Sequence, residues 1–212
     1  MREWVLYDSN TIDRDVLARR GQRLEYFTIG WNSIEALAAL ITGLLAGSIA
    51  LVGFGLDSMI EVVSGAALLW RLHRDVDEQQ REKAERFALW IVGSCFMALA
   101  AYITLDSLRS LVFRKSPEHS LIGIVVAIAA MVVMPVLGRA KRDVARQLGS
   151  AAMHSDARQA DFCMYLSAIL LGGLVLNVSL GWWWADPLAA LVMVPLIAKE
   201  GIGAFRGKTC AC

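Results

Sequence analysis

The chain has 212 residues, of which 57% are hydrophobic and 19% are charged, with a formal net charge of +1. This length allows one compact bundle and leaves little room for a second domain. The net charge of +1 says nothing about nucleic acid, because the basic residues are dispersed along short loops, and we expect no nucleic-acid partner. A mean hydropathy of +0.51 indicates an integral membrane protein.

Six apolar segments are long enough to cross a bilayer as helices. They lie near residues 25–45, 48–70, 87–108, 119–138, 152–177 and 187–204. We therefore predict an all-α membrane protein with six transmembrane helices in one bundle. The corresponding division is an N-terminal segment 1–24, a transmembrane domain 25–205 and a short tail 206–212.

Lys and Arg concentrate on one side of the predicted bundle. That side carries the N-terminal segment, the charged stretches 71–86 and 139–146, and the tail. The opposite side carries the uncharged corner at Gly47 and the tryptophans 182–184, whose indole rings suit the headgroup region. Because positively charged loops are retained in the cytoplasm, we expect both termini to be cytoplasmic. In a bacterium the protein would lie in the cytoplasmic (inner) membrane.

Two carboxylates one helical turn apart interrupt the second apolar segment. Asp57 and Glu61 stand at positions i and i+4, so they face the same way on a helix and repel each other. A carboxylate at the bilayer centre costs roughly 2.5–3.5 kcal/mol on insertion scales. Such a pair indicates a site that a divalent cation or a proton visits.

Two further acids are expected at a similar depth in the membrane. Glu35 lies near the middle of the first segment, and Asp161 lies about nine residues into the fifth. Four carboxylates would offer the oxygen ligands that suit a hard or borderline divalent cation. Structural roles stay open for both. Glu35 could hydrogen-bond Asn32 or Ser33, and Asp161 could pair with Arg158.

Nitrogen and sulfur ligands are sparse in the predicted membrane interior. No histidine lies there, so the imidazole that zinc sites commonly use is missing. Cys163 is two residues from Asp161 and points away from it on a helix, which predicts a core-packing role. Cys210 and Cys212 form a C-x-C pattern in the tail. Whether that pattern or Asp156 binds metal is left open.

The second and fifth segments resemble motifs of the cation diffusion facilitator (cation efflux) family. Ser48-Ile49-Ala50-Leu51 followed by Asp57-Ser58-Met59-Ile60-Glu61 is similar to the family's S-x-A-L…D-x-x-x-D signature. The stretch 154–161 is similar to its fifth-helix H/D-x-x-x-D pair, with Asp161 at the last position. The resemblance covers all six predicted spans.

The resemblance implies a six-helix, proton-coupled exporter of zinc and related divalent metals that is usually a homodimer. Glu61 replaces the usual Asp, which lengthens the ligand arm. Ala157 stands where the family has His or Asp, and Glu35 could supply the missing carboxylate. The sequence ends a few residues after the sixth span, so we expect a short form without the family's C-terminal cytoplasmic domain.

We therefore expect a divalent transition-metal transporter, with zinc as first cargo and manganese, iron or cobalt behind it. Proton-coupled efflux by alternating access would proceed around a metal site of Asp57, Glu61, Asp161 and Glu35. The expected partners are the lipid bilayer, the metal ion and protons as substrates, and a second copy of the chain, with no resident cofactor. The alternative is a non-transporting membrane protein that binds metal or regulates a partner. Catalytic motifs such as H-E-x-x-H and G-x-S-x-G are missing, which argues against an enzyme.

Overall fold

The computed structural model describes residues 3–73, 78–114, 117–118, 120–148 and 151–206, and all regular structure in these ranges is α-helical. Six helices follow one another along the described chain, each with a stretch long and apolar enough to cross a membrane. They are α1 (Glu3–Ala46), α2 (Ile49–His73), α3 (Glu78–Phe113), α4 (Leu121–Leu148), α5 (Ala151–Leu180) and α6 (Ala185–Phe205). The predicted all-α, six-helix architecture is confirmed, and the chain is a multi-pass integral membrane protein.

The helices extend beyond the predicted spans because charged segments continue them. α1 begins at Glu3, so the described part of the N-terminal segment 1–24 belongs to the first helix. The basic stretch 139–146 lies within α4. Hydropathy marks only the apolar part of a helix, whereas backbone hydrogen bonding carries the helix onward wherever charged side chains reach water.

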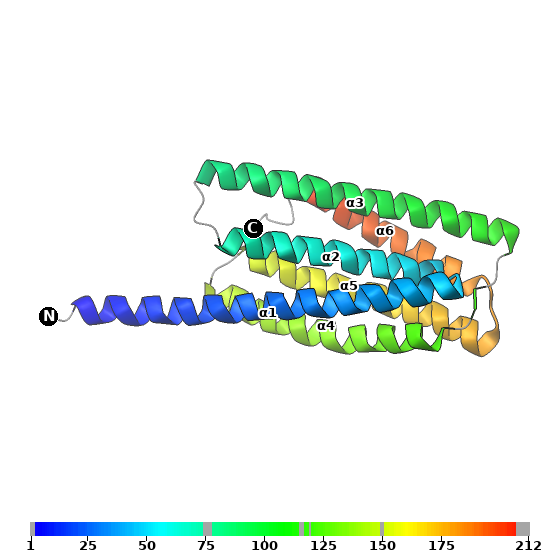
Figure 1. Cartoon of the computed structure of the whole chain (residues 1–212), viewed down its shortest axis with the longest axis horizontal. Coiled ribbons are helices and arrows are strands. Elements are labelled where there is room, and N and C mark those ends of the chain that lie inside the picture. Colours follow the sequence, from blue (N-terminus) through cyan, green and yellow to red (C-terminus); the bar gives the residue numbers. More distant parts are fainter. Residues whose placement is uncertain (1–2, 74–77, 115–116, 119, 149–150, 207–212) are drawn as a thin grey trace.

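The helices run along one long axis and form three pairs (Figure 1). α3 packs on α6, α1 packs on α2, and α4 packs on α5, with a further contact between α1 and α4. α1 and α5 begin, and α6 ends, at one end of the bundle, which we call the terminus end. The predicted corner between the first two spans lies at the opposite end, the hairpin end. Gly47 turns the chain there with φ +65°, which glycine adopts without steric cost.

α2 is the most enclosed of the six spans. Within the apolar window of each helix, 61% of the α2 residues are buried, against 33% to 39% in the other five. The outer helices present large apolar side chains outward, as Ile34, Leu37 and Leu45 do on α1. Such faces suit contact with lipid tails. Polar groups of α2 are therefore surrounded by protein rather than by lipid.

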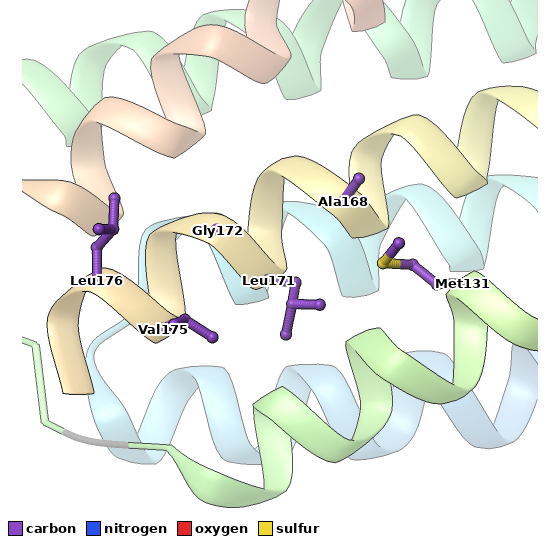
Figure 2. A pocket seen from close by; sticks show the side chains of 6 residues that line it. All are labelled: Met131, Ala168, Leu171, Gly172, Val175 and Leu176. Carbon is purple, nitrogen blue, oxygen red and sulfur yellow. The ribbon is translucent and has the colours of Figure 1, made fainter. Parts of the chain in front are cut away.

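A recess of about 480 Å³ opens between α4 and α5 toward the hairpin end (Figure 2). Its lining is apolar and consists of Met131, Ala168, Leu171, Gly172, Val175 and Leu176. None of these side chains is a ligand for a hard or borderline cation. This recess is therefore not a cation site.

The hairpin end of α2 is held by an acid from α6. The carboxylate of Asp186 accepts a hydrogen bond of 2.5 Å from Ser48 Oγ and one of 2.8 Å from the backbone N–H of Ile49. The first N–H groups of a helix have no partner within the helix. Asp186 satisfies one of them, and it thereby fixes the start of α2 against the start of α6.

A buried charge cluster joins α1, α4 and α5 toward the terminus end. Lys141 of α4 is 1% exposed, and its ammonium pairs with Glu25 of α1 at 3.2 Å and with Asp156 of α5. The Glu25 side chain is fully buried, and Asp156 is 14% exposed. Buried charges persist only when they are paired, so this cluster ties three helices together.

We expect Lys141→Met to lower the free energy of unfolding by about 3–5 kcal/mol, because two buried carboxylates lose their cation. The measurement is unfolding of the purified protein in detergent, followed by circular dichroism. Lys199→Met is the matched control, because Lys199 is exposed on α6. Equal stability of the two variants would contradict a structural role for the cluster.

Candidate metal centre

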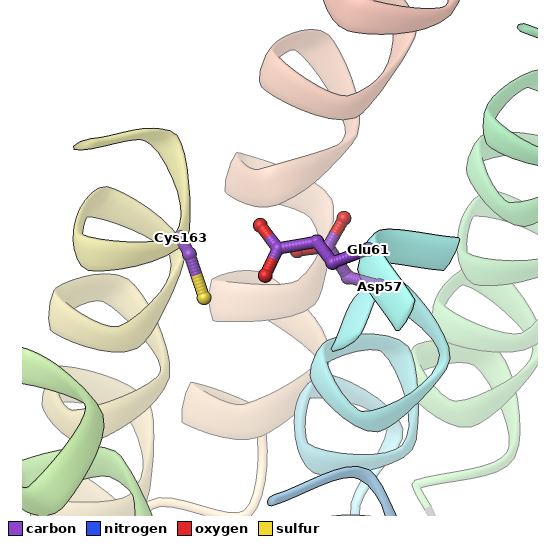
Figure 3. A group of neighbouring side chains, drawn as sticks. All are labelled: Asp57, Glu61 and Cys163. Carbon is purple, nitrogen blue, oxygen red and sulfur yellow. The ribbon is translucent and has the colours of Figure 1, made fainter. Parts of the chain in front are cut away.

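The acidic pair of α2 lies inside the bundle. Asp57 is fully buried and Glu61 is 7% exposed. Their i, i+4 spacing places both on one face of α2, and Figure 3 shows both carboxylates on the side of α2 that faces α5. α2, the most enclosed helix, therefore places two acids in the interior of the bundle.

A thiol from α5 joins the two carboxylates. Asp57, Glu61 and Cys163 each offer one ligand atom, and these three atoms all lie within 4.8 Å of one another. Cys163 is fully buried, and its sulfur points from α5 toward the carboxylates (Figure 3). The sequence predicted a core-packing role for Cys163. The structure places it in the core and, in addition, beside the acidic pair.

Several oxygens in this group lack hydrogen bonds. Both carboxylate oxygens of Asp57 and Oε1 of Glu61 are buried without a hydrogen-bond partner among the residues that the structure describes. An ionised carboxylate without a partner is very costly in an apolar interior. These atoms are therefore free to hold a cation or protons.

Glu35 of α1 lies at the edge of the group and is 3% exposed. Its carboxylate accepts hydrogen bonds of 2.8 Å from Trp31 Nε1 and 2.8 Å from Ser58 Oγ. The Cys163 thiol also donates to Glu35 Oε1, at 3.9 Å. Glu35 thus contacts the candidate site, with hydrogen-bond donors from α1, α2 and α5.

Asn32 is a residue whose role at the site the sequence did not reveal. The sequence allows Asn32 as a partner for Glu35, but in the structure its Nδ2 donates a hydrogen bond of 2.6 Å to Glu61 Oε2. Asn32 is fully buried. It fixes the orientation of Glu61 and leaves Oε1 of that carboxylate without a hydrogen-bond partner in the described chain.

Asp161 does not join the other predicted ligands. Residues two apart on a helix point about 200° apart, so Asp161 and Cys163 cannot both face α2. Cys163 faces α2, and Asp161 accepts a hydrogen bond of 2.5 Å from Arg142 Nη1 of α4. Its side chain is 36% exposed. The alternative pairing with Arg158 is replaced by this pairing with Arg142.

Two other open questions from the sequence have different outcomes. Asp156 belongs to the buried cluster with Lys141 and lies apart from the three-residue group. Cys210 and Cys212 fall outside the described residues.

The fold and the buried ligand group together define a six-span membrane protein with a candidate cation site in its interior. The sequence model of the cation efflux transmembrane domain matches residues 26–208. The chain therefore belongs to the cation efflux family, and the resemblance to the cation diffusion facilitators is confirmed.

Three curated proteins are similar to the chain. A cation-efflux pump FieF of Shewanella oneidensis is 26% identical over 171 residues, covering 79% of this chain and 57% of the pump. An uncharacterized transporter of Synechocystis is 24% identical, covering 69% of this chain and 49% of the transporter. Transmembrane protein 163 of Xenopus laevis is 24% identical, and the match covers 84% of this chain and 64% of that protein. The chain thus spans about half to two thirds of the length of these relatives.

The geometry predicts which acids matter for metal binding. At a zinc concentration about 100 times the Kd, binding should raise the free energy of unfolding by about 2.7 kcal/mol. Asp57→Asn removes a ligand and should abolish most of this gain, whereas Asp161→Asn should retain it. Thermal unfolding in detergent with and without zinc measures both. If the Asp161→Asn variant lost as much of the zinc-dependent stabilisation as Asp57→Asn, Asp161 would be a metal ligand.

Proposed function

We propose that the chain transports a divalent transition-metal cation, with zinc as the preferred cargo and manganese, iron and cobalt behind it. The observation that carries this proposal is the buried pair of Asp57 and Glu61, three of whose oxygens have no hydrogen-bond partner in the described chain. Membership in the cation efflux family and the similarity to a cation-efflux pump support it.

Asp57 and Glu61 bind the metal from α2, and Glu35 contributes negative charge beside them from α1. Asn32 holds Glu61 in place through its hydrogen bond. Since Asp161 pairs with Arg142, the proposed ligand set omits it. Three carboxylates surrounded by apolar helices attract a divalent cation because few other partners can neutralise them.

Protons are the second substrate in this proposal. A buried carboxylate is stabilised by either a cation or a proton, so the two compete for the same oxygens. Metal binds when the carboxylates are ionised, and protonation on the opposite side of the membrane releases it. Alternating access of the site to the two sides then couples metal efflux to proton entry.

The direction, efflux, is inferred from the family alone, whereas the orientation of the chain is inferred from the distribution of basic residues. The terminus end, rich in Lys and Arg, is proposed to be cytoplasmic, so the metal enters the site from there. A homodimer is proposed as the working assembly. The chain is proposed to perform no enzymatic reaction.

Zinc flux into proteoliposomes tests the proposal. With an acidic lumen, the reconstituted chain should import zinc, because outward proton movement drives metal inward. Asp57→Ala should reduce this flux to the level of protein-free vesicles, because the metal loses a central ligand. Glu118→Ala, an exposed acid near the hairpin end, is the control and should transport normally.

Collapse of the pH gradient should also stop the flux. Normal flux through folded Asp57→Ala protein would contradict the assignment of the site. If the folded wild-type protein passes none of the four metals, the alternative of a non-transporting metal-binding or regulatory membrane protein replaces the transporter.

A further inference from the structure

We infer that Cys163 is a thiolate ligand of the transported metal, and that it makes the site selective for thiophilic ions such as zinc and cadmium over hard ions such as manganese and magnesium. This inference rests on the proposed transport function and names the class of cargo that the site accepts. It differs from the prediction drawn from the sequence, in which the ligands were carboxylates alone.

The position of Cys163 supports a ligand role. Its ligand atom lies within 4.8 Å of those of Asp57 and Glu61, close enough for one ion to contact all three after small adjustments. The two α2 acids hold three buried oxygens without a hydrogen-bond partner in the described chain. Cys95, in contrast, is exposed on α3. Only Cys163, among the cysteines in the described chain, stands beside buried and unpartnered carboxylates.

Metal binding converts the thiol to a thiolate. The S–H bond breaks, a metal–sulfur bond forms, and the proton passes to Glu35, whose Oε1 already accepts the thiol hydrogen bond. The divalent cation then faces the negative charges of Asp57, Glu61 and the Cys163 thiolate. Glu35 thus contributes negative charge to the empty site, and this proton neutralises it once the metal and the thiolate are in place.

The donor set decides the class of metal. Carboxylate oxygens alone suit magnesium, calcium and manganese, whereas thiolate sulfur favours zinc and other thiophilic ions. Two carboxylates and one thiolate form a mixed set of the kind that zinc accepts, with a position left for a further ligand. In the described chain no histidine belongs to this group. The Cys163 sulfur is therefore the ligand that favours thiophilic ions there.

A spectroscopic experiment tests the ligand directly. Cobalt(II) is added to the full chain carrying Cys95→Ser, Cys210→Ser and Cys212→Ser, so that Cys163 is the single thiol. We expect a sulfur-to-cobalt charge-transfer band, which oxygen ligands do not produce. The band should disappear on Cys163→Ser and also on Asp57→Asn, which keeps the thiol but removes its neighbouring ligand. Absence of the band in the single-thiol chain, shown to be folded, would overturn the inference.

Selectivity supplies a second readout. In the flux assay, Cys163→Ser should lower zinc and cadmium flux at low metal concentration by about tenfold or more, with manganese flux changed much less. Cys163→Asp, which replaces sulfur by a hard oxygen ligand, should shift the preference toward manganese. An unchanged zinc-to-manganese ratio in both variants would contradict the inference.

The two proposals fail in distinguishable ways. Zinc flux that requires Asp57 but is unaffected by Cys163→Ser would leave the transporter intact and refute the thiolate ligand. A cobalt band that requires Cys163 and Asp57, in a chain without flux, would support the ligand and refute transport.

Discussion

The structure depends on one electrostatic constraint, namely that two carboxylates on the same face of α2 are buried side by side. Asp57 and Glu61 repel each other, and the surrounding helices offer them few hydrogen-bond donors. Burying such a pair costs free energy in the absence of a positive partner. The rest of the bundle supplies the stability that keeps α2 enclosed, and a visiting cation or protons supply the missing charge.

Polar contacts outside the pair hold α2 and its neighbours in position. Asp186 fixes the hairpin end of α2 against α6. Toward the terminus end, Lys141 joins α1, α4 and α5 through paired charges. Lys141 also acts on Glu61 from a distance, but its ammonium is already paired with Glu25 and Asp156. We therefore expect a substrate cation or protons to supply the positive charge that the acidic pair still needs.

Much of the fold could be predicted from the sequence, because hydropathy and residue spacing are local properties of the chain. Hydropathy found the six spans, and the i, i+4 spacing placed Asp57 and Glu61 on one face of α2. The helix ends could not be predicted from the sequence, because hydropathy does not detect charged helical turns such as those of stretch 139–146. The face of α5 that lies toward α2 could not be predicted from the sequence either. Helical geometry separated Asp161 from Cys163, but only the packing of α5 between α2 and α4 decided which of the two faces the site.

If one metal ion binds between α2 and α5, its position in the loaded protein can be located. A crystal structure of the zinc-loaded chain, with anomalous scattering recorded at the zinc edge, would show where the ion lies. We expect a peak among Asp57, Glu61 and Cys163, with a zinc–sulfur distance of about 2.3 Å and zinc–oxygen distances of about 2.0–2.2 Å. A peak beside Asp161, or none within the bundle, would contradict this expectation.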